Sequence, residues 1–302
     1  MVEKSSLLLI DLGYALFYRY SATQLWYKHS HPEEKAELTK DYKWSDNQEF
    51  IEKMKKMFVV DILTLAKKNK VPKTNIIIAE DCRLKDNWRT QIYPDYKAQR
   101  SVEREKAGWQ GISAFEIIYN EVIPEMVNVH GVIHLKSPSV EADDIISQIV
   151  IKSLENKKTC PSKMIIVASD NDYFQILEDN VELINMKGVS QKDKMKFSPK
   201  GHLIEKILKG DISDNIEACS FNKKIVKDLV PGMPAKIKST DDYIKANKKI
   251  IDYYVNNPDE LEKHIMEHPE YIKGYQENKK LIAFSELPKE YIEQINLLFT
   301  FK

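Results

Sequence analysis

Two aspartates follow a short apolar run near the middle of the chain. In the stretch VASDNDYFQIL, Asp170 and Asp172 come directly after the apolar residues 164–168. Solvated turns often carry aspartate, so a polar loop is one interpretation. Carboxylates at the end of a buried strand are also suited to binding a divalent cation. The rest of the sequence bears on the choice between these two interpretations.

Four further acidic groups stand at comparable positions, each after an apolar run or at the start of an expected helix. They are Asp11, then Asp81, then Glu141 with Asp143 and Asp144, and finally Asp211 with Asp214. A turn or a helix N-terminus explains any one of them. Five such groups in one chain are harder to explain by local structure, and together they predict a metal centre.

Apolar runs and helical spacing indicate alternating strands and helices over the first two hundred residues. The expected strands are 7–10, 75–81, 131–135, 163–169 and 181–186, and the expected helices are 48–68 and 141–155. Strands separated by helices favour parallel pairing in an α/β fold. Because the carboxyl ends of parallel strands meet at one edge of a sheet, the acids should converge there.

Strand patterns disappear after about residue 200. Four segments there have the apolar spacing of helices, namely 201–210, 241–257, 259–282 and 288–301. The sequence therefore predicts an α/β domain over residues 1–200 and a helical C-terminal region over residues 201–302, without a flexible linker between them.

The donor atoms at the predicted metal centre are all carboxylate oxygens. No cluster of cysteine and histidine accompanies them, so Mg²⁺ or Mn²⁺ is favoured over zinc. Clustered carboxylates repel one another unless cations are bound. Six or more acids suit two ions about 3.5–4 Å apart, the arrangement that cleaves phosphodiesters.

A basic segment begins directly after Asp81. Residues 83–106 carry the bases Arg83, Lys85, Arg89, Lys97, Arg100, Arg104 and Lys106. Lys97, Arg100 and Arg104 have helical spacing, and Trp88, Tyr93 and Tyr96 offer rings on which bases can stack. Bases beside a metal centre suit a polyanionic substrate. The alternative is a solvated helix of mixed charge.

Composition limits the class of protein. The 302 residues have a formal net charge of zero, which argues against a uniformly basic nucleic-acid binder. Three cysteines without metal-like spacing indicate free thiols in a reducing compartment. No apolar run approaches the roughly 20 residues of a membrane span, and the first run ends at Asp11. We expect an intracellular protein that is neither secreted nor membrane-bound.

The order of these motifs resembles the 5′-nuclease superfamily, which includes flap endonucleases and the 5′–3′ exonuclease domains of bacterial DNA polymerases. The motifs are LLLIDLGYALFYR, IAED, WRTQIYPDYKAQR, VEADDIIS, ASDNDYFQI and LKGDISDNI. The likeness is nearest to the bacteriophage ribonuclease H branch. It implies a PIN-like α/β fold with a mostly parallel central sheet, flanking helices, a helical arch at about 82–125 and a helical C-terminal region.

The resemblance also implies individual roles, with two Mg²⁺ or Mn²⁺ ions as cofactors. Ligands of the ion that activates the attacking water would be Asp11, Asp81, Glu141 and Asp143. Ligands of the second ion would be Asp170, Asp172 and Asp211, with Asp214 nearby. Residues that contact nucleic acid would be Phe17, Arg19, Arg89, Lys97, Arg100 and Arg104. Lys97 and Arg100 would act on the scissile phosphate, and Phe17 would stack on the terminal nucleotide.

The implied activity is that of a structure-selective 5′ nuclease in DNA replication or repair. Its substrates would be DNA with a 5′ flap or 5′ end and RNA–DNA hybrids. We expect a monomer, with a single-strand-binding protein or a sliding clamp as candidate partners. The alternatives are a PIN-type ribonuclease for single-stranded RNA and a non-catalytic nucleic-acid-binding scaffold.

The sequence departs from the superfamily after GDISDNI. Many members continue with a glycine-rich hairpin that grips duplex DNA, and this chain does not. Five lysines between positions 223 and 238 are candidates for phosphate contacts instead. A solvated basic stretch is the alternative.

Overall fold

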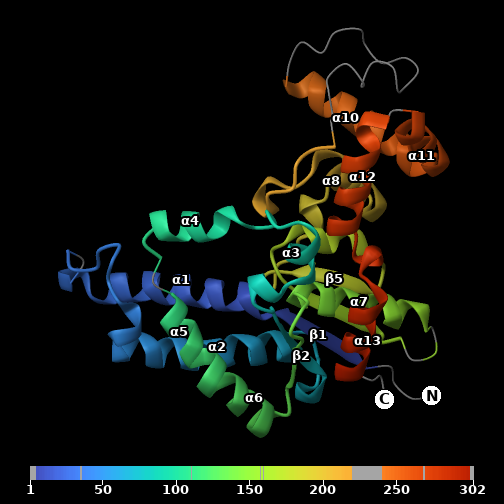
Figure 1. Ribbon diagram of the computed structural model, residues 1–302. Helices are drawn as coiled ribbons and strands as arrows, with labels where there is room; N and C mark the ends of the chain where they lie inside the picture. The colour runs from blue at the N-terminus through green and yellow to red at the C-terminus, as the bar shows by residue number, and fades with distance from the viewer. Residues whose placement is uncertain are drawn as a thin grey trace.

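Figure 1 shows the computed structural model, which describes residues 5–34, 36–109, 111–156, 158, 160–219, 240–267 and 269–299. Residues 240–247 and 270 are described by their backbone alone. The lysines predicted as phosphate contacts between positions 223 and 238 lie outside these residues.

A five-stranded parallel sheet forms the centre of the molecule. Its strands are β1 (Ser6–Asp11), β2 (Ile76–Glu80), β3 (Ile133–Lys136), β4 (Lys163–Val167) and β5 (Val181–Ile184), in the order β3-β2-β1-β4-β5. All four strand pairs are parallel. The strands match the five predicted ones. Since β2 and β4 flank β1, three acid-bearing strand ends lie side by side at one edge.

Alternate residues of each strand enter two different cores. Leu8 and Ile10 of β1 belong to one core, and Leu7 and Leu9 belong to the other. Both faces of the sheet are therefore covered, which explains why the strands read as continuous apolar runs.

Helices from different parts of the chain cover these faces. The first face packs against α1 (Leu12–Ser30), α2 (Gln48–Lys68) and the helical stretch formed by α5 (Ile112–Ile117), a π-helical turn (Ile118–Val122) and α6 (Ile123–His130). The second face packs against α7 (Ala142–Glu155) and α13 (Lys289–Leu298), which lie side by side in Figure 1.

The sequence predicted α2 at its observed bounds and α7 to within one residue, but it did not predict α1. The buried side of α1 includes the polar residues Arg19 and Thr23, whereas Phe17 and Leu25 are exposed. Apolar and polar residues are thus mixed around the helix, and the helical pattern is weak. Asp11 begins α1 as its N-cap, accepting a hydrogen bond from Tyr14 N at 2.9 Å.

The predicted arch contains α3 (Trp88–Ile92) and α4 (Gln99–Lys106). In Figure 1, α4 extends away from the sheet and lies above α1. Lys97 was predicted to share a helix with Arg100 and Arg104, and this is wrong. Lys97 has a left-handed backbone conformation with φ 54°, and its N–H donates to Asp214 O at 2.9 Å. The helix begins only at Gln99.

Within the described residues, the C-terminal region is helical, as predicted. It contains α8 (Pro199–Lys209), α10 (Thr240–Asn256), α11 (Pro258–Glu267) and α12 (Pro269–Ile282), which share a small core of their own. The chain then returns to the sheet, where Phe284, Leu287 and Ile295 are buried in the second core. A division of the chain at residue 200 therefore does not follow the packing of the last segment.

None of the helices in the described part of the chain has the length and apolar character that a membrane span requires.

Candidate metal centre

Asp11 and Asp81 meet at the ends of β1 and β2. Asp81 Oδ1 accepts a hydrogen bond from Ala142 N at 2.8 Å, which ties the β2 end to the first turn of α7. Gly13 lies beside both acids. A Cβ atom there would lie 3.1 Å from Asp81 Oδ2 and 3.5 Å from Asp11 Oδ1. Glycine thus leaves the space around the two carboxylates open. Gly13 was not predicted, although a glycine two positions after a strand-end aspartate was a usable signal.

Asp11, Asp81 and Asp143 have raised pKa values, so each of these acids is costly to ionise. Burial, followed by repulsion from Asp81, raises the pKa of Asp11 to about 7. Burial and the charge of Glu141 raise the pKa of Asp81 and hold the pKa of Asp143 well above its usual range. In the described residues, no basic side chain forms an ion pair with Asp11, Asp81 or Asp143. A bound divalent cation would supply the missing positive charge.

Two of the acids at the start of α7, Glu141 and Asp144, have basic partners. Oxygens of Glu141, Asp143 and Asp144 lie within 4.8 Å of one another. The Arg89 guanidinium donates to both oxygens of Asp144, at 2.7 and 2.8 Å. Lys97 Nζ lies 2.6 Å from Glu141 Oε1. Burial alone would raise the pKa of Glu141. The charges of Lys97 and Arg89 outweigh this effect and lower the pKa to about 2.

Several residues predicted to contact nucleic acid are buried instead. Arg89 is 3% exposed, and beyond its acid partners it donates to Leu281 O. Arg19 is also buried and pairs with Asp61. In this structure the charges of both arginines are paired inside the protein, and their predicted contacts with nucleic acid stay predictions. The sequence could not reveal this, since Asp144 lies 55 residues from Arg89.

Two of the three predicted stacking rings are likewise buried. Trp88 donates from Nε1 to Asp144 Oδ2 at 3.0 Å. Tyr96 donates to Glu141 Oε2 at 2.8 Å and approaches Asp214 Oδ2 at 3.2 Å. Both rings therefore support the acids rather than offer a surface for bases.

Lys97 and Arg100 reach the acid edge, where a phosphate would have to bind. Lys97 is buried between Glu141 and Asp214. The Arg100 side chain is 38% exposed and pairs with Asp214 at 2.6 Å. This position is compatible with their predicted action on a phosphate, which stays a prediction.

A third acid group contains Asp172, Asp211 and Asp214, with oxygens within 4.8 Å of one another. Asp211 is fixed by Ser213, whose N–H donates to it at 2.8 Å. The prediction placed Asp170 in this group. Asp170 accepts a hydrogen bond from Asp172 N, and its charge helps to raise the pKa of Asp11, so it lies between the groups and its assignment to the second ion stays a prediction.

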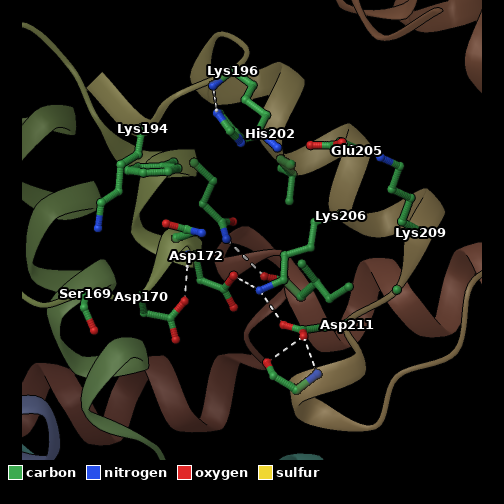
Figure 2. A pocket seen from close by; sticks show the side chains of 17 residues that line it. Ser169, Asp170, Asp172, Lys194, Lys196, His202, Glu205, Lys206, Lys209 and Asp211 are labelled. Carbon is green, nitrogen blue, oxygen red and sulfur yellow. Dashed lines mark hydrogen bonds and ion pairs between the residues drawn. The ribbon is translucent and has the colours of Figure 1, made fainter. Parts of the chain in front are cut away.

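Lys206 of α8 enters this third group and was not predicted. Figure 2 shows its ammonium between Asp172 and Asp211. The distance from Lys206 Nζ to Asp211 Oδ2 is 2.6 Å. Burial alone would raise the pKa of Asp211, but the charge of Lys206 outweighs this effect and lowers the pKa. A lysine in the helix that precedes Asp211 was the only signal in the sequence.

Phe17 and Arg104 come together away from the acids. The Phe17 ring, 38% exposed, stacks on Trp109 with ring centroids 5.2 Å apart. The Arg104 guanidinium lies 5.7 Å from the Phe17 ring and 5.5 Å from the Trp109 ring. A cavity of about 470 Å³ adjoins Phe17 and Trp109. An exposed ring beside a cation suits an unpaired nucleotide.

The donor set fits Mg²⁺ or Mn²⁺. It consists of carboxylate oxygens, and three of the acids form no ion pair with a basic side chain of the described residues. Cys82 follows Asp81 directly, but burial and the charge of Glu141 raise the pKa of its thiol to about 12. The thiol is therefore neutral near pH 7 and is a poor metal ligand.

Residues 6–207 match the family model described as 5′-3′ exonuclease, N-terminal resolvase-like domain. The chain belongs to this 5′-3′ exonuclease family. The superfamily predicted from the motifs is thereby confirmed. The more specific likeness to the bacteriophage ribonuclease H branch stays a prediction.

Two relatives illustrate the similarity of this 5′-3′ exonuclease family member to curated proteins. DNA polymerase I of Lactococcus lactis subsp. cremoris is 28% identical over 162 residues, which are 48% of this chain and 16% of the polymerase. Flap endonuclease Xni of Yersinia pseudotuberculosis is 33% identical over 107 residues, 35% of this chain and 37% of the relative. The alignments thus span well under half of either relative.

A solved structure shares the fold of this family member. It is the T5 5′-exonuclease with bound divalent zinc ions, which superposes with a TM-score of 0.53 at 13% identity over 97% of each chain. The predicted α/β, PIN-like architecture is confirmed. The assignment of single residues to ions and to nucleic acid stays a prediction.

Proposed function

We propose that this chain is a divalent-metal-dependent 5′ nuclease that hydrolyses phosphodiesters in DNA with a 5′ flap or a 5′ end. The observation that carries the proposal is the trio Asp11, Asp81 and Asp143, whose pKa values are raised and which form no ion pair with a basic side chain of the described residues. Lys97 and Arg100 at the same edge support it. So do the family membership and relatives that are named for flap endonuclease and polymerase activity.

The acids would hold the ions in two sets. Asp11, Asp81 and Asp143 would hold the first ion, with Asp170 nearby. Asp172, Asp211 and Asp214 would hold the second. Bound Mg²⁺ or Mn²⁺ supplies the Lewis acidity that activates water and stabilises the leaving oxygen. Two ions, rather than one, are part of the proposal.

The basic residues would act on the substrate. Lys97 and Arg100 now pair with Glu141 and Asp214. A phosphate at this edge would compete with Glu141 and Asp214 for Lys97 and Arg100. The two basic side chains would then neutralise the charge of the phosphate as the transition state forms. Glu141 would then be free to complete the first set of ligands.

The substrate range extends, in our proposal, to RNA–DNA hybrids. Action in replication or repair, an intracellular location, a monomeric state and partnership with a single-strand-binding protein or a sliding clamp stay predictions. The test of activity therefore includes a hybrid beside the flap.

The experiment uses a 5′-labelled flap duplex and a 5′-labelled RNA–DNA hybrid with Mg²⁺. We expect products near the junction or short products from the 5′ end. Asp170→Asn should lower the rate by about 100-fold or more, because it removes a charge at the metal centre. Asp179→Asn is the matched control, since Asp179 is exposed and precedes β5; its rate should equal that of the wild type.

Other outcomes would support the rival functions. Cleavage of single-stranded RNA without cleavage of either duplex would favour a PIN-type ribonuclease. Tight duplex binding without cleavage in Mg²⁺ or Mn²⁺ would favour a non-catalytic scaffold. An Asp170→Asn variant as active as the wild type would contradict a role for this acid.

A further inference from the structure

Lys206 lies where a cation would be expected. Its Nζ forms ion pairs with Asp172 and, at 2.6 Å, with Asp211. The side chain is only 23% exposed, so water screens these contacts weakly. Figure 2 shows the ammonium directed between the two carboxylates.

The two proposed ion sites differ in their own positive charge. In the second set, Asp172 and Asp211 pair with Lys206, and Asp214 pairs with Arg100 at 2.6 Å. Each acid of this set thus has a basic partner. In the first set, Asp11, Asp81 and Asp143 form no ion pair with a basic side chain of the described residues.

We propose that the Lys206 ammonium is the resident cation of the second acid set. The chain would then bind one divalent ion tightly at Asp11, Asp81 and Asp143, and a second ion only in competition with Lys206. This inference rests on the proposed function, because it assumes that both acid sets bind ions.

Competition follows from the positions of the atoms. An ammonium that contacts two carboxylates occupies the space in which an ion would contact the same oxygens. Two cations held there together would also repel each other strongly at such short range. Lys206 must therefore move before a second ion can bind both Asp172 and Asp211.

The structure provides room for that movement. A cavity of about 520 Å³ lies beside Lys206, and it is lined on other sides by Lys194, His202 and Lys209. The four-carbon stem of lysine is flexible, so the ammonium can turn into this space without a movement of α8. Lys194 and Lys196 also line the cavity, and their positive charges favour the position of Lys206 beside the acids.

Metal binding tests the proposal directly. The protein is titrated with Mn²⁺ in the absence of nucleic acid, and free Mn²⁺ is measured by electron paramagnetic resonance. The wild type should show one tight site and one weak site. Lys206→Met should strengthen the weak site by about tenfold or more, because the competing charge is removed. The tight site should keep its affinity.

Lys209→Met is the matched control. Lys209 lies on the same helix and borders the same cavity, but it pairs with Glu205 at 2.5 Å. Removal of its charge should leave both Mn²⁺ affinities unchanged. Equal strengthening by the two substitutions would overturn the proposal, since it would show a general effect of charge. Unchanged Mn²⁺ binding in Lys206→Met would also overturn it.

Circular dichroism confirms that each variant is folded, and Lys206→Gln replaces Lys206→Met if the latter does not fold. The two proposals fail in different ways. A wild type without a tight Mn²⁺ site contradicts the proposed function. A wild type with a tight site and a second site that is insensitive to residue 206 contradicts only the role of Lys206.

Discussion

Asp11 and Asp144 are both carboxylates at the acid edge, but they have opposite surroundings. Asp144 receives two hydrogen bonds from Arg89 and one from Trp88. Asp11 is hydrogen-bonded by Tyr14 and Tyr173 and is repelled by Asp81. At the scale of residues, the partner rather than the residue type separates an acid that stabilises the fold from one that is available to a cation.

Replacement of Asp11 should change how stability depends on pH. The folded protein holds a proton on Asp11 up to a pKa of about 7, whereas the usual value is 3.8. Between these values the folded state binds more protons than the unfolded state. The free energy of unfolding of the metal-free protein should therefore fall as pH rises from about 4 to about 7.

Asp11→Asn should reduce that fall, because asparagine can keep the cap on Tyr14 N without a charge. At about pH 8 in a chelator, we expect the variant to be more stable than the wild type by on the order of 1–2 kcal/mol. Urea unfolding over this pH range is the measurement. An unchanged slope in the variant would contradict the raised pKa.

Replacement of Arg89 should lower the stability of the folded protein. Arg89→Met leaves Asp144 as a buried charge without its partner, which should cost about 3–5 kcal/mol of stability. Lys85→Met is the control, because Lys85 is exposed in the same segment and should change stability little. If Arg89→Met kept its stability but bound DNA weakly, Arg89 would be a nucleic-acid contact after all.

At the scale of elements, α1 and α4 connect the proposed metal centre with the rings of Phe17 and Trp109. α1 begins at Asp11 in the metal centre, and one turn and a half later it presents Phe17 to Trp109. α4 carries Arg104 over the same two rings. Helix α1 thus connects the metal centre with the Phe17 ring. The number of residues between Asp11 and Phe17 sets the distance between these two sites.

Replacement of Arg104 should weaken the binding of a flap. Arg104→Ala removes a cation from the Phe17 and Trp109 rings and should raise the Kd for a single-stranded 5′ flap by about three- to tenfold. The melting temperature should hardly change, because the helix bearing Arg104 has no buried residues. Fluorescence anisotropy with labelled flap DNA measures this effect.

Glu105→Ala serves as the control on the same helix, and it should not weaken binding. An Arg104→Ala variant with wild-type affinity would place the flap elsewhere.

At the scale of the whole molecule, the last segment binds the helical region to the sheet. Phe284 N donates to Gln175 Oε1 at 3.0 Å, and Phe284 O accepts from Gln148 Nε2 at 3.1 Å. Arg89 donates to Leu281 O at 2.8 Å. Residues 281–284 therefore contact the same elements that position the acids.

Loss of the Phe284 side chain should destabilise the α/β core. Phe284 is 2% exposed, so Phe284→Ala leaves a cavity and should cost about 3–5 kcal/mol. Leu297→Ala is the control, since Leu297 of α13 is 87% exposed. Chemical denaturation of both variants distinguishes them, and equal stability would show that the C-terminal segment is not part of the core.

Much of the fold could be predicted because its signals are local. The strands are short apolar runs, and α2 has a regular apolar stripe, so the pattern within each segment specified each element. The parallel sheet then followed from the alternation of strands and helices. That topology in turn placed Asp11, Asp81 and Asp170 at one edge without any knowledge of side-chain contacts.

The partners of the charged residues could not be predicted, because they lie far apart in the sequence. Arg89 and Lys97 were expected to face nucleic acid, yet the structure joins them to Asp144 and Glu141. Lys206 had no special pattern around it. The sequence by itself determined which groups meet at the sheet edge, since strand polarity decides this. Only the tertiary structure decided which acids are already neutralised, because an ion pair depends on the folded distance between side chains.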